Sequence, residues 1–88
     1  MLQPEQVNAM ARIKQACDAT GETRSTFYSK AAAGLLTRPI KIGPRAAAVP
    51  VRELAAINAA RIRGESDVQI KALVARLHAE RAHVGTAQ

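Results

Sequence analysis

The stretch ATGETRSTFYSK, which runs from Ala19 to Lys30, decides the fold that this sequence predicts. A short helix is expected to end at Gly21, because glycine adopts the positive φ of a sharp turn at little cost. Thr23 is a suitable N-cap for a second helix that begins at Arg24, since its hydroxyl can accept a hydrogen bond from a free backbone N–H. The pattern is typical of a helix-turn-helix, although a plain helical hairpin shares it.

The second helix has an inward and an outward side. Phe27 and Ala31 lie one turn apart and are expected to pack inward together. The outward side begins with Arg24, Ser25 and Tyr28, whose side chains donate hydrogen bonds that phosphates and base edges can accept. We therefore predict that this helix enters the major groove of DNA. The candidate DNA-binding residues of this stretch are Thr23, Arg24, Ser25, Tyr28, Ser29 and Lys30.

The residues before this motif carry weaker signals. Met1 to Ala11 predict either a short helix that opens near Pro4 or a flexible arm. Arg12 to Thr20 predict the first helix of the motif, whose small apolar face is formed by Ile13, Ala16 and Cys17.

Residues 35–49 predict a β-hairpin. Side chains alternate in character from Leu36 to Gly43, which is typical of a strand, and Pro39 favours an edge position. Gly43-Pro44-Arg45 is a turn signal, after which Ala46 to Val49 can return as a second strand. This hairpin is expected to act as a basic wing beside the second helix, and the alternative is a surface loop with solvated charges. Its candidate DNA-binding residues are Arg38, Lys41 and Arg45.

A third helix is predicted after the hairpin. Pro50 suits its first turn, and Glu53 is favourable to the helix dipole at this end. Leu54 and Ile57 are its expected core anchors, and Gly64 is a natural stop. The sequence thus predicts a winged helix-turn-helix domain over residues 12–64, preceded by an N-terminal arm or short helix over residues 1–11.

A fourth helix is predicted over residues 65–83. Ser66 to Gln69 form a capping-box pattern, and Asp67 with Lys71 is a helix-supporting i,i+4 pair. The apolar stripe of this amphipathic helix must either fold back on the core or meet another molecule. Residues 84–88 are expected to form a disordered tail. As a candidate oligomer interface, the stripe consists of Ile70, Leu73, Val74 and Leu77.

The composition of the 88 residues narrows the class of function. Lys and Arg outnumber Asp and Glu by 13 to 7, and the formal net charge of +6 favours a polyanionic partner such as nucleic acid. Much of the 48% of hydrophobic residues is alanine, so only a small core is expected. No apolar run reaches membrane-spanning length and no signal-peptide pattern is found, so we expect a cytoplasmic protein with no membrane partner.

The sequence shows no pattern of a catalytic or metal site. Cys17 is the one cysteine, which excludes an internal disulfide, and it is expected to pack as a small apolar side chain. His78 and His83 have no acidic or cysteine company at ligand spacing. Paired carboxylates, nucleophile motifs and phosphate loops are also missing, so we expect no enzyme activity, metal, cofactor or small-molecule substrate.

Several segments match one family in their order and spacing: Thr20-Gly21, Arg24 to Tyr28, Gly34, Pro39 to Arg45 and Val49-Pro50. From Arg12 to Ile62, a little over half of the chain, the sequence resembles the AlpA-type phage regulators, which are related to the MerR-like winged-helix excisionases. The chain departs from the family at six positions. Val49 and Ile57 stand in place of two tryptophans, and Lys30 stands in place of an apolar residue. Thr23 replaces a serine, Leu36 a phenylalanine and Thr37 a proline.

The resemblance implies DNA contacts from Arg24, Ser25 and Tyr28 in the second helix, and from Lys41 and Arg45 in the wing. It further implies an excisionase (a recombination directionality factor) or a transcriptional regulator of a prophage or integrative element. A tyrosine integrase as partner and self-association on DNA are implied as well. We accordingly expect a sequence-specific DNA-binding protein. The alternative is a small protein-interaction module, an antitoxin or anti-repressor, that uses the C-terminal helix.

Overall fold

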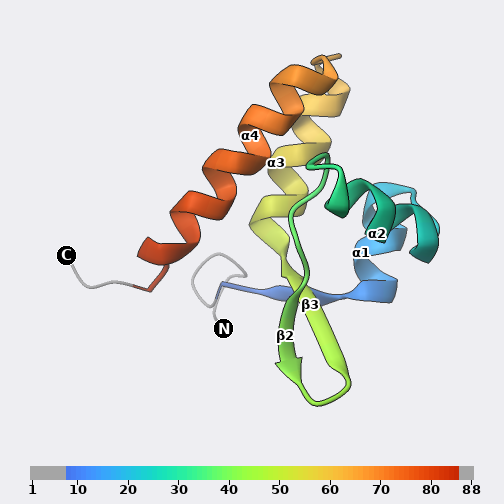
Figure 1. Ribbon diagram of the computed structural model, residues 1–88, viewed down its shortest axis with the longest axis vertical. Helices are drawn as coiled ribbons and strands as arrows, with labels where there is room; N and C mark the ends of the chain where they lie inside the picture. Colours follow the sequence, from blue (N-terminus) through green and yellow to red (C-terminus); the bar gives the residue numbers. More distant parts are fainter. Residues whose placement is uncertain (1–7, 86–88) are drawn as a thin grey trace, which may run out of the picture.

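The computed structural model describes residues 8–85. These residues are mainly helical and include a small three-stranded antiparallel sheet (Figure 1). None of the helices in this range is long and apolar enough to span a membrane. In chain order the elements are β1 (Met10–Arg12), α1 (Ile13–Thr20), α2 (Arg24–Ala32), β2 (Ile40–Gly43), β3 (Ala46–Pro50), α3 (Val51–Ile62), α4 (Asp67–Glu80) and the 3₁₀ turn η2 (Arg81–His83).

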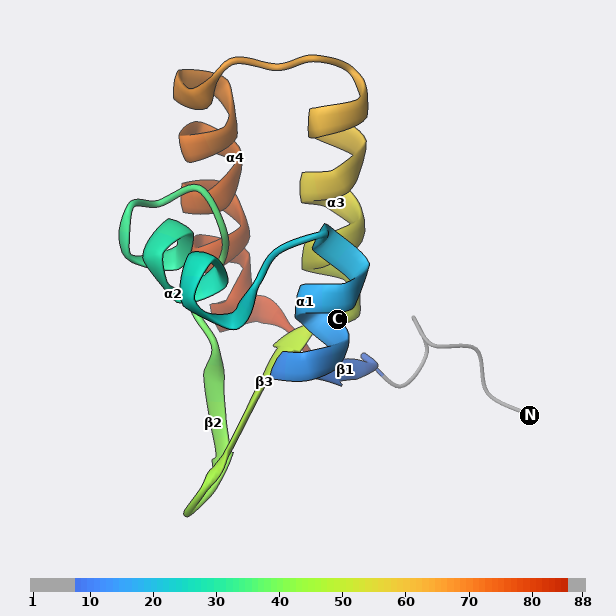
Figure 2. The same cartoon turned by 90° about the vertical axis from the view of Figure 1, so that its right-hand side faces the viewer.

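The sheet has the strand order β1-β3-β2, so β3 is central and pairs with both neighbours. Ala11 of β1 lies opposite Val49, and Ile40 of β2 lies opposite Ala48. The pairing of β2 with β3 is irregular between Lys41 and Gly43. The β2–β3 hairpin projects away from the helices in both views (Figures 1 and 2).

β1 corrects the prediction of an arm or short helix over residues 1–11. Met10 to Arg12 form a strand, and Ala11 is buried against the sheet. The N–H of Val51 also donates to the carbonyl of Ala9 at 2.8 Å. The strand forms because a partner 38 residues away in the chain supplies its hydrogen bonds, a contact that local composition cannot reveal. Residues 1–7 of the expected arm lie outside the described residues.

The turn between α1 and α2 has the predicted geometry. Gly21 adopts φ 74°, the left-handed conformation that glycine tolerates best. The N–H of Glu22 donates to the carbonyl of Cys17 at 3.0 Å, which closes the end of α1. The Thr23 hydroxyl accepts a hydrogen bond from the N–H of Thr26 at 3.2 Å. The predicted helix stop and N-cap are therefore both confirmed.

The segment before β2 differs from the predicted strand. Leu36 and Thr37 are neighbours in sequence, yet both are fully buried. Successive residues of a strand point to opposite faces, so this pair belongs to a folded loop. Regular pairing begins only at Ile40, one residue after Pro39, which has no N–H to donate.

α3 begins at Val51, so Pro50 is its N-cap and not a residue of its first turn as predicted. Glu53 in its first turn is fully buried and forms an ion pair with Arg81 of η2. This contact ties the C-terminal end of the described chain to the start of α3.

α4 packs beside α3 in both views, and its apolar stripe belongs to the core of the chain (Figures 1 and 2). The candidate oligomer interface is therefore corrected. The chain is rich in alanine and has no tryptophan, so its other elements fill little of the core volume. The aliphatic side chains of α4 pack against α3 and complete the core. The four residues involved are Ile70, Leu73, Val74 and Leu77, each at most 9% exposed.

The capping box at the start of α4 is confirmed. The Ser66 hydroxyl accepts from the N–H of Gln69 at 3.2 Å, and the Gln69 carbonyl oxygen accepts from the N–H of Ser66 at 2.8 Å. The predicted pair of Asp67 with Lys71 is not among the ion pairs of residues 8–85, although both residues lie on α4. Lys71 is thus left without this local partner.

Candidate nucleic-acid interface

The exposed start of α2 carries the first group of candidate residues. Tyr28 is 41% exposed, and its ring packs edge-to-face on the buried ring of Phe27 with centroids 6.2 Å apart. The guanidinium carbon of Arg24 lies 6.0 Å from the centroid of the Tyr28 ring, within cation–π range. A core residue thus supports Tyr28, and Tyr28 supports Arg24 at the surface.

A groove of about 1050 Å³, here called the basic groove, lies beside this part of α2. Its walls are the start of α1, the face of α2 with Tyr28 and Ala31, the hairpin from Gly43 to Ala47, and the face of α4 with Val74 and His78. Seven basic residues line it, and no Asp or Glu does. They are Arg12, Lys14, Arg24, Arg38, Lys41, Arg45 and Lys71.

Within residues 8–85, the carboxylates that form ion pairs do so with cations outside the basic groove, with one exception. Glu22, Glu53 and Glu65 pair with cations that do not line the basic groove. The exception is Asp18, which lies 3.6 Å from the ammonium of Lys14 in a pair whose side chains are 71% and 86% exposed. Such an exposed pair is weak and easily exchanged. The basic groove therefore concentrates positive charge, which attracts a polyanion.

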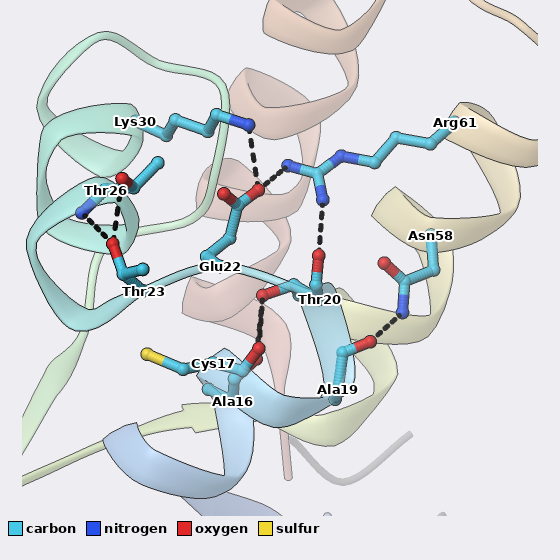
Figure 3. Close-up of polar contacts among 10 residues, drawn as sticks. All are labelled: Ala16, Cys17, Ala19, Thr20, Glu22, Thr23, Thr26, Lys30, Asn58 and Arg61. Carbon is cyan, nitrogen blue, oxygen red and sulfur yellow. Dashed lines mark hydrogen bonds and ion pairs between the residues drawn. The ribbon is translucent and has the colours of Figure 1, made fainter.

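Lys30 is placed differently from the prediction. Its ammonium donates to Oε2 of Glu22 at 2.8 Å, and Nη2 of Arg61 lies 3.1 Å from the same oxygen (Figure 3). The hydrogen bond from Lys30 is the main cause that lowers the pKa of Glu22, and the charges of Lys30 and Arg61 lower it further. Lys30 does not line the basic groove, so we assign it a structural contact instead of a DNA contact.

The same cluster fixes the turn between α1 and α2 onto α3. Nη1 of Arg61 donates to the carbonyl of Thr20 at 3.2 Å (Figure 3). Nδ2 of Asn58 donates to the carbonyl of Ala19 at 2.9 Å. These two bonds satisfy carbonyls at the end of α1, which have no partner within the helix. Side chains from α3 therefore hold the turn that precedes α2.

Arg38 and His78 meet at the edge of the basic groove. The backbone N–H of Arg38 donates to Nε2 of His78 at 3.0 Å, and Nη1 of Arg38 lies 3.1 Å from Nδ1 of the same ring. Burial lowers the pKa of His78, and the nearby charges of Arg38 and Arg81 lower it further. A neutral His78 is thus favoured, which keeps Nε2 available as an acceptor.

The structure brings together five of the nine predicted DNA-binding residues and leaves the others apart. The five that line the basic groove are Arg24, Tyr28, Arg38, Lys41 and Arg45. Thr23, the N-cap of α2, and Ser25 and Ser29 on the helix are exposed but do not line the groove. Among residues 8–85, no cluster of three or more His, Cys, Asp or Glu could hold a metal ion.

Three cations of the groove were not predicted as DNA-binding residues from the sequence: Arg12, Lys14 and Lys71. Arg12 and Lys14 lie where β1 joins α1, a junction that the sequence did not indicate. Lys71 does carry a signal, because it lies three, four and seven residues before Val74, Ala75 and His78, which is the spacing of one helix face.

Comparisons with protein-family models, with curated proteins and with solved structures found no significant match to this chain.

Proposed function

We propose that this protein binds double-stranded DNA in a sequence-specific manner as a winged helix-turn-helix protein. The observation that supports this proposal most strongly is the basic groove, whose seven cations and lack of acidic residues suit a polyanion. The groove separates the exposed start of α2 from the projecting hairpin. In the proposed complex, α2 lies in the major groove and the hairpin is the wing that follows the phosphate backbone.

The side chains on α2 suit the reading of bases. Arg24 can donate two parallel hydrogen bonds to a guanine edge, which is the most common specific contact in the major groove. Tyr28 holds the guanidinium of Arg24 through its ring, so Arg24 loses less freedom on binding than an unsupported side chain. Lys41 and Arg45 on the hairpin suit phosphate contacts, which position the protein without reading sequence.

The biological role that we propose is that of an excisionase or transcriptional regulator of a mobile element. This part of the proposal rests on the resemblance to AlpA-type regulators over residues 12–62. A tyrosine integrase is the proposed partner for the excisionase role.

The alternative, a protein-interaction module, was suggested by the apolar stripe of α4, and this stripe is buried in the structure. Leu73 and Val74 of the α4 stripe are 9% and 2% exposed within the chain itself. A partner could reach them only if α4 left the core. The favoured proposal remains DNA binding.

The proposal is tested by selection from a pool of random duplex DNA with the full-length protein, followed by sequencing of the bound fraction. The proposal predicts enrichment of a defined motif in the bound duplexes, and loss of this enrichment when Arg24 is replaced by alanine. Binding without any enriched motif would contradict sequence specificity, and no binding at low salt would contradict DNA binding altogether.

A further inference from the structure

We propose that Lys71 of α4 contacts a DNA phosphate, so that the C-terminal helix forms one wall of the DNA site. This inference rests on the proposed function and extends it. In this proposal α4 both completes the core and contacts DNA, and the DNA contact lies on a face of the helix next to its buried stripe.

The position of Lys71 on α4 directs it toward the basic groove. Lys71, Val74, Ala75 and His78 all line this groove, and their spacing places them on one face of the helix. Val74 is buried in the core, whereas Lys71 is exposed. The face therefore passes from the core to the groove, with Lys71 on the groove side.

The stem of Lys71 lies against the end of α2. Gly34 follows α2 with φ +81°, and a Cβ added there would lie 3.7 Å from Cγ of Lys71. The aliphatic stem of the lysine thus passes close to a backbone that has no side chain at this point. A long side chain can lay its stem along such a surface and keep its ammonium in the solvent, where a phosphate can reach it.

The charge of Lys71 is not used by an ion pair within residues 8–85. Asp67 lies one turn earlier on the same helix, yet the two side chains do not pair. Arg38, the groove cation nearest in the fold to His78, is likewise without a carboxylate within 4.0 Å in this part of the chain. Lys71 and Arg38 therefore add two uncompensated charges to the side of the groove formed by α4.

Arg76 provides a matched control on the same helix. It is an exposed cation five residues after Lys71, but it does not line the basic groove. A change of Lys71 and a change of Arg76 alter the net charge equally. Only a direct phosphate contact makes their effects on the salt dependence of binding different.

The experiment compares the full-length wild type with Lys71→Gln, Lys71→Arg and Arg76→Gln in titrations of one duplex at several salt concentrations. Glutamine keeps the first part of the stem that passes close to Gly34, and thermal melts confirm that each variant is folded. The loss of one phosphate contact should reduce the slope of log K against log salt by about 0.9. The affinity ratio of wild type to Lys71→Gln should therefore fall about 3.5-fold between about 50 and 200 mM salt.

The proposal expects this change for Lys71→Gln, a slope near wild type for Arg76→Gln, and a slope restored by Lys71→Arg. Equal slopes for Lys71→Gln and Arg76→Gln, with wild type still binding the duplex, would overturn the role of Lys71 and leave the proposed function intact. Failure of the wild type itself to bind duplex DNA would overturn both.

Discussion

Glu53 is fully buried at the start of α3, and its carboxylate accepts two hydrogen bonds from Arg81 of η2 at 2.7 and 2.8 Å. Nη2 of Arg81 also donates to the carbonyl of Arg38 at 2.8 Å. One guanidinium thus connects α3, the segment before β2 and the end of α4. Because Arg38 lines the basic groove, this buried pair supports the groove from behind.

Replacement of Arg81 by alanine should destabilise the protein strongly. The change leaves the buried carboxylate of Glu53 without its partner, which typically costs about 3–5 kcal/mol. Urea denaturation measures this free energy of unfolding. The control is Arg63→Ala, which breaks an ion pair with Glu65 at the surface and should cost at most about 1 kcal/mol. Equal losses of unfolding free energy in the two variants would show that the buried pair with Glu53 contributes no more than a surface ion pair.

The apolar stripe of α4 should behave as core and not as an interface. Leu73→Ala removes a side chain that is 9% exposed and should lower the free energy of unfolding by about 2–5 kcal/mol. Val68→Ala on the same helix is the control, because Val68 is 78% exposed and its loss should be almost neutral. If Leu73→Ala melted like wild type but no longer bound DNA cooperatively, the stripe would be an oligomer interface and not core.

Stability should depend on pH through His78. The folded state holds the pKa of this ring below its ordinary value of 6.5, so the unfolded chain takes up the proton at a higher pH. The free energy of unfolding should therefore fall as the pH drops below about 6.5, until it reaches the lowered pKa. Denaturation curves measured from about pH 5 to 7.5 should show a smaller slope of stability against pH for His78→Gln, which cannot titrate, than for wild type. The same slope in both proteins would contradict this role of His78.

The two cations of the hairpin should act on all DNA sequences alike. The double variant Lys41→Gln, Arg45→Gln should lower the salt slope by about 1.8, if each residue contacts one phosphate. A double variant of exposed cations outside the basic groove, Arg52→Gln with Arg76→Gln, removes equal charge and should leave the slope near wild type. A loss confined to one base position, without a change of slope, would point to base reading by the hairpin instead.

Features that depend on a few neighbouring residues could be predicted from the sequence. Gly21, Thr23 and Ser66 act through bonds to residues three or four positions away, and their roles agree with the expectations. The mainly helical fold with a small hairpin was predicted for the same reason. The sheet, however, has a third strand, because β1 depends on pairing with the distant β3.

Features that depend on distant partners could not be predicted. Lys30 was assigned to DNA because its local position suits it, but Glu22 and Arg61 hold it at the turn. For Lys71 the sequence predicts a local pair with Asp67, whereas in the fold this lysine lines the basic groove. In both cases the sequence gives the charge of the side chain, and only the fold shows what faces it.

The most direct test of the account is the affinity of wild type, Arg24→Ala and Arg76→Ala for a selected duplex and for a scrambled one at fixed salt. If Arg24 reads a base from α2, its loss should weaken binding to the selected duplex by about 5- to 150-fold and affect the scrambled duplex much less. Arg76→Ala should leave the ratio between the two duplexes unchanged. Arg24→Ala and Arg76→Ala variants with the same affinities for both duplexes would contradict the claim that α2 and the basic groove form a sequence-reading DNA site.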